Sequence, residues 1–370
     1  MLRLSAVLAI FAFSTSLAQA EIPNQVARVS ETEAIDALTQ RANELAKQDA
    51  FSGQLLVARH GKVLLDQSWG LADRESGVAV NSDTQFRIGS MNKMFTAVAI
   101  LQLVEAKKIG LSDTLAKFLP DYPNKELASK VTIRHLLMHT GGTGDIFGPG
   151  FDSYRLKLRD HNSYIAQFGT RPLLKEPGAG FQYSNYGFVL LGAVIERVSG
   201  MSYYDYVEKN VYQPAGMQNT ASLPEDADVP RRAKGYMQRG GTWKPNTDTL
   251  PYRGMAAGGG YSTARDLLAF AQALQSGKLI SKTMLDEATE ANGAGDGIGL
   301  CFMHDGVGET RMFGHNGSAP GMNGALWIYP RAGYIVIGLS NLDRGAATGP
   351  MIFFVRRMPI TPSIANSPAN

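Results

Sequence analysis

The stretch Phe86-Arg-Ile-Gly-Ser-Met-Asn-Lys-Met-Phe95 predicts the end of a strand, a turn at Gly89 and a helix that runs to about Lys108. Within it, Lys93 follows Ser90 by three residues, so one helical turn places both side chains on the same face. A serine hydroxyl becomes an effective nucleophile when a base such as an unprotonated lysine lies within hydrogen-bond reach. Ser90 and Lys93 are therefore a candidate catalytic nucleophile and base.

The helix predicted after Ser90 is apolar on almost every face, which indicates a buried central helix. Burial would hold Ser90 rigidly and would disfavour the protonated form of Lys93, as a base requires. The helix N-terminus also favours negative charge that develops nearby. A serine that merely caps a helix gives the same Ser-x-x-Lys spacing, so the assignment depends on partners elsewhere in the chain. The apolar members are Phe95, Val98, Ala99, Ile100, Leu101, Leu103 and Val104.

The first twenty of the 370 residues are typical of a secretory signal, with Arg3, an apolar run over residues 4–17 and a small-x-small cleavage site ending at Ala20. The run is short for a membrane span, and a residual anchor is the alternative. We expect an exported protein, periplasmic or secreted, that begins at Glu21 and has no stable membrane span after signal cleavage.

Composition and charge exclude several classes of partner. The net charge is +3 without a cluster of Lys and Arg, which argues against nucleic acid. The single cysteine, Cys301, cannot form an internal disulfide, and we interpret it as a packed residue. His135 and His139 lie four residues apart, but no glutamate accompanies them as in His-Glu-x-x-His, so we expect no metal and no cofactor. The sequence leaves the oligomeric state open.

Strands are predicted at both ends of the chain and helices in the middle. Short turns between the strands favour an antiparallel sheet. We expect a sheet-containing α/β domain formed by residues 21–110 and 251–358, a helical domain over 111–250 with the active site between the two, and a disordered tail over 359–370. Residues 145–160 are interpreted as a surface loop. The predicted strands cover residues 54–59, 63–69, 299–303, 311–315, 325–329 and 334–340.

A second polar motif, Tyr183-Ser-Asn185, precedes a predicted helix over residues 185–198. The positive charge of a nearby lysine would lower the pKa of the Tyr183 phenol and let it relay protons. The Asn185 carboxamide can hydrogen-bond both Lys93 and a substrate amide or ester. The alternative is a turn before a helix, with Asn185 as the cap and Tyr183 as a packed aromatic residue.

A third motif, His315-Asn316-Gly317, is predicted to end a strand, and Ser318 follows it. A glycine at this place lets substrate lie against the strand edge, and the next backbone N–H group can donate to an oxyanion. Similar motifs occur elsewhere. Tyr122-Pro-Asn124 has the spacing of the second motif and is interpreted as a turn. His139-Thr-Gly141 and His304-Asp-Gly306 have the spacing of the third, but only His315 is predicted to end a strand of the C-terminal sheet.

The three motifs, in this order, resemble those of the serine beta-lactamase and penicillin-binding protein superfamily. The Tyr-x-Asn form is similar to its class C beta-lactamase, DD-peptidase and esterase branch. The resemblance runs from about residue 51 to residue 344. It extends to His135-Leu-Leu-Met-His-Thr-Gly-Gly142, Pro177-Gly-x-x-Phe-x-Tyr-Ser-Asn-Tyr-Gly187, Val198-Ser-Gly200, Gly216-Met217 and Gly258-Gly-x-x-Ser-Thr-Ala-Arg-Asp-Leu267.

The resemblance implies an α+β fold, an antiparallel β-sheet flanked by helices plus an inserted mainly α-helical domain. It also implies that Ser90 is the acylated nucleophile. Lys93 and Tyr183 would share the base and proton-shuttle work, and either one can take the Ser90 proton. Asn185 would orient Lys93 and the substrate.

The resemblance further implies that the segment His315, Asn316, Gly317 and Ser318 binds and orients substrate. The backbone N–H groups of Ser90 and Ser318 would form the oxyanion hole. His315 would bind Tyr183 or a substrate carboxylate, with a charge that varies near neutral pH.

The chain departs from that pattern in two places. Class C beta-lactamases generally have lysine at the position of His315. The absence of that lysine here favours an esterase or D-peptide hydrolase over an efficient beta-lactamase. A packed C-terminal helix is expected, yet Pro350 and Pro359 leave only residues 351–358 between them. One side of the sheet is therefore predicted to be less well covered.

Together these observations predict a serine hydrolase that acts through an acyl-enzyme on a small ester or on a D-amino-acid amide or short peptide. A true class C beta-lactamase or a DD-carboxypeptidase is the alternative. A catalytically silent relative that binds cell-wall peptide or a partner protein is the alternative from another class.

Overall fold

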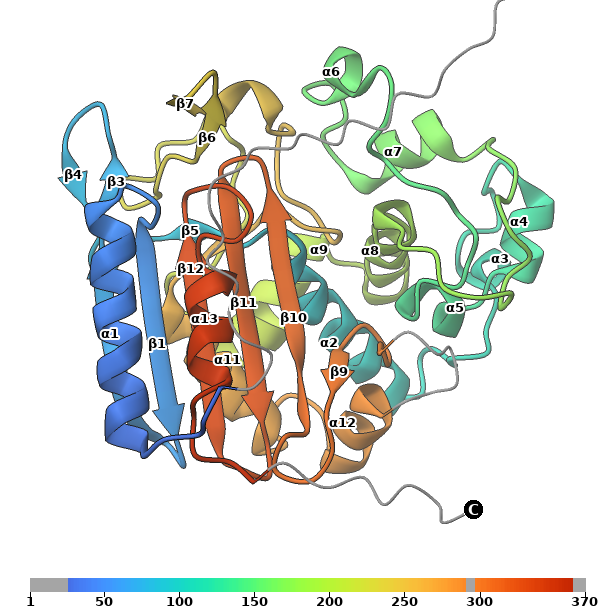
Figure 1. The fold of residues 1–370 in the computed structure, drawn as a ribbon. Coiled ribbons are helices and arrows are strands. Elements are labelled where there is room, and N and C mark those ends of the chain that lie inside the picture. Colours follow the sequence, from blue (N-terminus) through green and yellow to red (C-terminus); the bar gives the residue numbers. More distant parts are fainter. Residues whose placement is uncertain (1–25, 291–296, 362–370) are drawn as a thin grey trace, which may run out of the picture.

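The computed structural model describes residues 26–290 and 297–361, and in these ranges the main sheet has six antiparallel strands in the order β2-β1-β12-β11-β10-β9. β1 pairs with β12, so the two ends of the chain meet inside the sheet (Figure 1). The expected α+β class is confirmed. The strands are β1 (Gly53–Arg59), β2 (Lys62–Trp69), β9 (Met303–Asp305), β10 (Met312–Ala319), β11 (Met322–Tyr329) and β12 (Tyr334–Ser340).

Helices cover both faces of this sheet. Because successive strand residues point to opposite faces, Leu55 and Val57 of β1 pack with α1 and α13, whereas Leu56 and Ala58 pack with the helices on the other face. The layers are visible in Figure 1. The flanking helices are α1 (Glu31–Lys47) and α13 (Thr348–Val355) on one face, and α2 (Asn92–Glu105), α11 (Ala264–Gln275) and α12 (Lys282–Thr289) on the other.

The hairpin between β1 and β2 turns at His60 and Gly61, as predicted. Both residues have positive φ, 48° and 82°, which matches the two-residue turn that suits the twist of antiparallel strands. α2 is buried along nearly its whole length, which confirms the predicted central helix.

The C-terminal segment covers more of the sheet than the sequence indicated. α13 begins before Pro350, which falls in the first helical turn, where its missing N–H is not needed. Met351 and Phe354 are fully buried against the sheet. Residues 359–361, predicted to belong to the disordered tail, are ordered here: Ile360 is buried, and Thr361 N donates to Glu309 at 2.7 Å.

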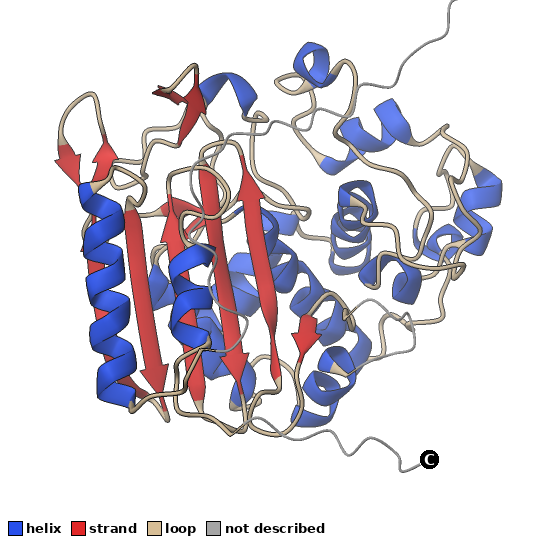
Figure 2. Ribbon diagram, viewed as in Figure 1, coloured by secondary structure: helices blue, strands red, loops and turns tan. Residues whose placement is uncertain are grey.

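A mainly helical lobe stands beside the sheet and is organised around α8 (Figure 2). α8 (Asn185–Ser199) follows the cap Ser184, and Gly200, with a positive φ of 71°, terminates it. The predicted surface loop over residues 145–160 contains one short helix, and its Ile146 and Leu158 are buried. The other lobe helices are α3 (Leu115–Phe118), α4 (Lys125–Lys130), α5 (Ile133–Leu137), α6 (Phe151–Tyr154) and α7 (His161–Phe168).

The sequence that follows α8, assigned to the helical domain, packs both against α8 and against α2 and α11, the helices that cover the sheet. α9 (Tyr203–Val207) contacts α2, and its Tyr203 hydroxyl lies 3.1 Å from Asn92 Nδ2 and 2.8 Å from Thr96 Oγ1. A π-helical segment, η2 (Glu208–Tyr212), and the short α10 (Gln213–Ala215) continue this layer. The boundary between lobe and sheet layers therefore falls near the end of α8.

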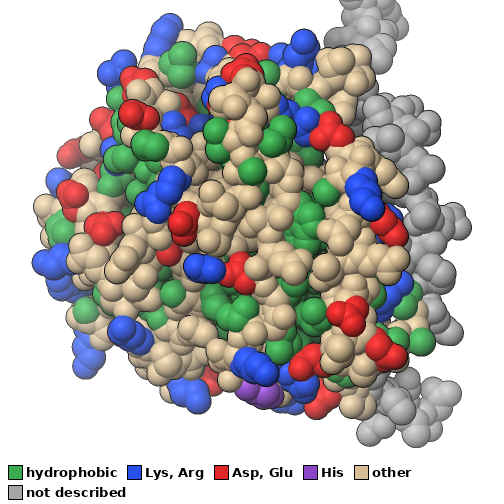
Figure 3. Space-filling model, turned by 90° about the vertical axis from the view of Figure 1, so that its left-hand side faces the viewer, with side chains coloured by type: hydrophobic (Ala, Val, Ile, Leu, Met, Phe, Trp, Pro, Cys, Tyr) green, Lys and Arg blue, Asp and Glu red, His purple; other side chains and the backbone are tan. Residues whose placement is uncertain are grey.

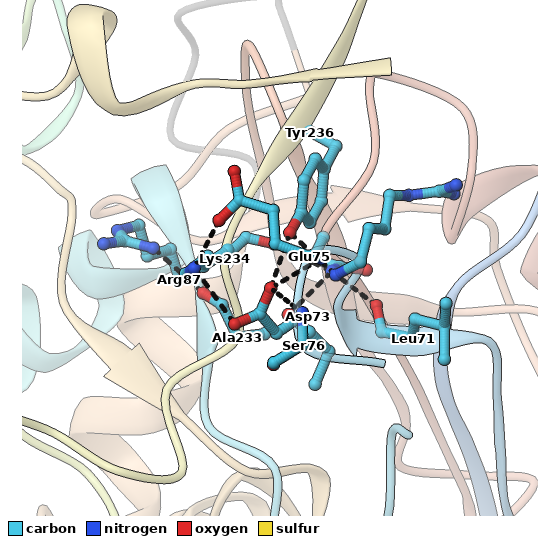
Figure 4. Close-up of polar contacts among 11 residues, drawn as sticks. Leu71, Asp73, Glu75, Ser76, Arg87, Ala233, Lys234 and Tyr236 are labelled. Carbon is cyan, nitrogen blue, oxygen red and sulfur yellow. Dashed lines mark hydrogen bonds and ion pairs between the residues drawn. The ribbon is translucent and has the colours of Figure 1, made fainter. Parts of the chain in front are cut away.

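A polar cluster ties the returning chain to a hairpin that follows β2 (Figure 4). Lys234 Nζ lies 3.0 Å from Asp73 Oδ2 and 2.7 Å from Glu75 Oε2, and the Tyr236 hydroxyl donates to Asp73 Oδ1 at 3.1 Å. The hairpin strands are β3 (Leu71–Asp73) and β4 (Val78–Ala79). Further short pairs are β5 (Phe86–Arg87) with β8 (Tyr261–Ser262) and β6 (Tyr236–Arg239) with β7 (Thr242–Pro245).

The strand predicted over residues 299–303 is wrong for most of its length, because β9 begins only at Met303. Cys301 has a φ of 80°, a left-handed conformation that no extended strand contains. Its N–H donates to Gly299 O at 2.8 Å in a tight turn. The Cys301 thiol is fully buried, in agreement with its interpretation as a packed residue.

The face of the molecule in Figure 3 carries Lys and Arg interspersed with Asp and Glu. Within residues 26–290 and 297–361, no helix is both long and apolar enough to cross a membrane. The predicted signal peptide over residues 1–20 and the tail beyond residue 361 lie outside the described ranges.

Candidate active site

Ser90 lies in a short 3-10 turn, η1 (Gly89–Met91), that leads directly into α2. Gly89 has a φ of 52°, which favours glycine. β10 packs tightly against this turn: a Cβ atom on Gly317 would lie 2.0 Å from Ile88 O and 3.2 Å from Ser90 N. The lack of a side chain at Gly317 therefore makes room for the nucleophile turn, while its predicted role beside the substrate stays a prediction.

Lys93 has three polar contacts and no exposure to solvent. Its Nζ lies 3.2 Å from Ser90 Oγ and 2.7 Å from Asn185 Oδ1, and it donates to the carbonyl oxygen of Ala257. Burial lowers the pKa of the Lys93 ammonium to about 7. An appreciable fraction of Lys93 is thus a neutral amine near neutral pH, able to accept a proton.

Tyr183 approaches Ser90 from the loop before α8. Its hydroxyl donates to Ser90 Oγ at 2.9 Å, and its ring stacks on His139 with 4.2 Å between ring centroids. The predicted lowering of its pKa is wrong: burial raises the pKa of the Tyr183 phenol, and the hydrogen bond to Ser90 opposes this only in part. Tyr183 therefore remains a phenol and a proton donor around neutral pH.

Asn185 is the first residue of α8 and faces both the lysine and the lobe. Its Oδ1 points to Lys93, and its Nδ2 lies 3.1 and 3.0 Å from the two carboxylate oxygens of Asp145. Ser184 caps the helix by accepting from Gly187 N at 2.9 Å. Asn185 is therefore not the cap that the alternative interpretation of this motif required.

His315 lies in the middle of β10, because the strand continues through Ala319 instead of ending at the histidine as predicted. The His315 ring is buried, with Nδ1 2.5 Å from Asn316 O. Burial and then the Lys93 charge lower the pKa of His315 to about 4, so the expectation of a charge that varies near neutral pH is wrong. The side chains of Asn316 and Ser318 are exposed and line the cleft.

A cleft of about 950 Å³ opens over Ser90. One wall comes from the lobe and is rich in aromatic and aliphatic side chains, and the other comes from the end of β10, the following turn and α13. The cavity is large enough for a small acyl group together with a leaving group. Its apolar members from the lobe and the neighbouring loops are Ile146, Phe147, Phe151, Tyr164, Leu250 and Met255.

Two of the three similar motifs belong to the scaffold, with His304 in strand β9. Tyr122 is buried with its hydroxyl 3.0 Å from that of Tyr186, and Asn124 caps α4. His139 is the exception, because it stacks on Tyr183 and accepts from Ser184 N at 3.0 Å. Sequence reasoning missed this role, although His139 belongs to one of the segments that carry the family resemblance.

Asp145 was also missed, because it was placed in a loop whose shape the sequence does not give. Within residues 26–290 and 297–361, no group of three or more His, Cys, Asp and Glu residues is arranged to hold a metal ion. His135 Nδ1 accepts from Thr132 N at 3.3 Å, and His139 Nδ1 is likewise taken by a backbone N–H.

In this site a serine is hydrogen-bonded to a buried lysine and to a tyrosine, at the border of an antiparallel sheet and a helical lobe. This arrangement defines a serine hydrolase of the beta-lactamase and transpeptidase type. The family model described as Beta-lactamase matches residues 35–355, and the chain belongs to this family. The recognition made from the three motifs is thereby confirmed.

Named relatives span several activities. The chain is 30% identical to the putative penicillin-binding protein PbpX of Bacillus subtilis, over 84% of this chain and 75% of the relative. It is also 30% identical to Esterase EstB of Burkholderia gladioli, over 81% and 88%. Among solved structures, a penicillin-binding protein from Bacillus halodurans has a TM-score of 0.76 at 31% identity, covering 84% of this chain and 98% of that one. A D-stereospecific amidohydrolase from Streptomyces sp. has a TM-score of 0.71 at 29% identity, covering 85% and 97%.

Proposed function

We propose that this protein hydrolyses small esters and D-amino-acid amides or short D-peptides through an acyl-enzyme on Ser90. The observation that supports this best is the position of Ser90 Oγ, 3.2 Å from the Lys93 amine and 2.9 Å from the Tyr183 hydroxyl. A base and a neutral proton donor thus contact the same nucleophilic oxygen, as acyl transfer requires.

In the proposed reaction, Lys93 takes the proton of Ser90 as Oγ attacks the substrate carbonyl. Tyr183 keeps its proton until the tetrahedral intermediate collapses and is placed to give it to the leaving group. Water then attacks the ester formed on Ser90 while the Tyr183 phenolate takes a proton from it, and protonated Lys93 returns a proton to Ser90 Oγ as the acid is released. Lys93 and Tyr183 return to their starting protonation states, so no other reactant is consumed.

The backbone N–H groups of Ser90 and Ser318 are our candidates for the oxyanion hole. A Cβ built on Gly89 would lie 3.4 Å from Ser318 N, and one on Gly317 would lie 3.2 Å from Ser90 N. The two amides therefore belong to segments in close contact beside the nucleophile. This supports the role proposed for them.

The choice of substrate follows from the cleft. Its lobe wall is largely apolar, which suits a small hydrophobic acyl group. His315 replaces a lysine and is uncharged near neutral pH, so β10 offers no buried cation to a substrate carboxylate. Similarity to an esterase and to a D-stereospecific amidohydrolase supports the same substrate classes.

The test is hydrolysis of short p-nitrophenyl esters and of D-amino-acid amides by the wild type and by Ser90→Ala. Ser129→Ala is the matched control, because its hydroxyl contacts only Glu126 O on the lobe surface. We expect turnover by the wild type and the control and none above background by Ser90→Ala. Undiminished turnover in Ser90→Ala would refute the assignment.

A beta-lactamase or DD-carboxypeptidase is the second candidate, favoured by similarity to penicillin-binding proteins. Intact mass after incubation with a penicillin separates the possibilities. A lasting adduct on Ser90 indicates recognition of cell-wall D-peptides, and ring-opened drug without an adduct indicates a beta-lactamase. A chain that forms no acyl-enzyme with either penicillins or reactive esters would be the silent, ligand-binding relative.

We further propose that the protein is exported to the periplasm or secreted, with cleavage after Ala20. The sequence of the first twenty residues supports this. Expression of the full chain, fractionation and N-terminal sequencing test it, with Glu21 expected as the first residue. An intact N-terminus on a cytoplasmic product would contradict the proposal.

A further inference from the structure

We propose that Asp145 is a positioning residue. It fixes the orientation of the Asn185 side-chain amide and thereby directs the lone pair of neutral Lys93 toward Ser90. This inference rests on the proposed function, because it concerns how the base of that reaction is oriented. Asp145 contacts neither Ser90 nor Lys93 by a hydrogen bond, so it would act through Asn185.

The orientation of the Asn185 amide follows from its surroundings. Both Asp145 carboxylate oxygens lie within 3.1 Å of Asn185 Nδ2. An ionised carboxylate only accepts hydrogen bonds, so the NH₂ group of Asn185 must face it. With NH₂ turned to Asp145, the amide oxygen is left facing Lys93 Nζ at 2.7 Å.

The Asp145 carboxylate is itself held in place. Its Oδ1 accepts from the backbone N–H groups of Ile146 at 2.6 Å and Phe147 at 3.1 Å, which closes a turn at the start of the loop. The backbone oxygen of Asp145 accepts from Arg171 Nη1 at 2.8 Å. The carboxylate therefore presents a fixed acceptor to the amide.

The amide orientation decides where the lone pair of a neutral Lys93 points. A neutral amine has two hydrogens and one lone pair. Asn185 Oδ1 and Ala257 O are both acceptors, and they take the two hydrogens. Ser90 Oγ is the remaining partner, so the lone pair faces the Ser90 hydroxyl. With the Asn185 amide reversed, its NH₂ group would compete with Ser90 for that lone pair.

The other titratable groups around Lys93 do not fix this orientation. The Cys301 thiol, the His139 and His315 rings and the Tyr183 phenol act on it through charge or stacking. Among the described residues, Asp145 supplies the carboxylate that is hydrogen-bonded to the Asn185 amide. Loss of this carboxylate removes the preference for one amide orientation.

Asp145→Asn tests the proposal with little disturbance. The introduced carboxamide keeps an oxygen for the N–H groups of Ile146 and Phe147, while the charge and the second acceptor are lost. Asp121→Asn is the control, because Asp121 is an exposed carboxylate of the same lobe outside the cleft. The readouts are the rate at which a small fluorophosphonate labels Ser90, followed by intact mass, and kcat/KM for p-nitrophenyl acetate across pH 5 to 9.

We expect Asp145→Asn to slow labelling and lower kcat/KM on the order of 10- to 100-fold, as for other groups that orient a catalytic residue. The acid limb of the pH profile should move to lower pH, because the carboxylate favours protonated Lys93. In an Asn185→Ala background, Asp145→Asn should have little further effect, since its action passes through the amide and the Asn185 backbone N–H lies a long 3.4 Å from Asp145 Oδ2. Asp121→Asn should match the wild type.

The proposal is overturned if Ser90 of Asp145→Asn is labelled at the wild-type rate. It is also overturned if the effect of Asp145→Asn adds fully to that of Asn185→Ala while the acid limb of the kcat/KM profile stays at the wild-type pH. Should Asp145→Asn fail to fold, Asp145→Ser retains a hydroxyl acceptor for the turn and takes its place. A wild-type protein that reacts with neither probe would instead refute the proposed function. A reactive wild type with an equally reactive variant refutes only the role of Asp145.

Discussion

The two walls of the active-site cleft differ in what holds them. The nucleophile wall, formed by η1, α2 and β10, is part of the core, and its Lys93 has no exposed surface. The lobe wall, formed by the segments from His139 to Asn185, reaches the surface, where Phe147 is 54% exposed. In the proposed reaction, the first wall supplies the nucleophile and the base, whereas the second supplies the groups that orient the base and most of the apolar surface that faces the substrate.

The largest effect is expected from Lys93→Met, which removes the base and leaves the buried volume filled. We expect kcat/KM for p-nitrophenyl acetate to fall about 10²- to 10⁴-fold, the usual contribution of general base catalysis. Lys117→Met is the control, because that lysine is exposed and paired with Asp113. If a folded Lys93→Met variant loses less than tenfold in kcat/KM, Tyr183 is the base instead, and the nucleophile wall does not supply both the nucleophile and the base.

The pH dependence gives the next largest effect. Neutral Lys93 is the active form and its pKa is lowered to about 7, so kcat/KM should fall about tenfold per pH unit below pH 7 and level off above it. His315 has a pKa lowered to about 4 and stays neutral in this range. The fall of kcat/KM below pH 7 should therefore persist in His315→Gln. If that fall disappears in His315→Gln, it is caused by protonation of the histidine.

The smallest effect is expected on the lobe wall. Phe147 lines the cleft and contacts the Phe151 ring, with 4.9 Å between centroids, but its side chain is 54% exposed. Phe147→Ala should lower the ratio of kcat/KM for p-nitrophenyl butyrate over acetate roughly 2- to 10-fold, less than a methylene is worth in a closed pocket. Leu156→Ala, in the same loop outside the cleft, is the control.

Fluorophosphonate labelling of Ser90 should stay at the wild-type rate in Phe147→Ala, because the substitution keeps the Phe147 backbone N–H that donates to Asp145 and leaves Lys93, Tyr183 and Asn185 in place. A variant that slows labelling as much as it changes chain-length preference would show that the two walls are not separable in this way.

The nucleophile wall is also the part that sequence predicts best. Ser90 and Lys93 are three residues apart on one helix, so their contact follows from helical geometry, and the uniformly apolar helix predicts their burial. Burial in turn predicts the lowered pKa of Lys93. The antiparallel sheet follows from short turns such as that at His60 and Gly61.

The lobe wall was less predictable because its contacts join distant segments. Asp145 and Asn185 are 40 residues apart and meet only through the fold of a loop. The contact of Gly317 with Ile88 depends on how closely two elements pack, which spacing does not reveal. The wrong strand before Met303 shows that a short apolar run does not distinguish a strand from a buried turn.

The single thiol of this protein has a practical consequence. Cys301 is fully buried, and its interaction with the Lys93 charge places it in the core near that lysine. A thiol reagent can reach it only when that core opens, so its labelling rate reports the frequency of opening. Comparing the rate before and after acylation of Ser90 would show how strongly a covalent substrate restrains the catalytic core, without any added probe.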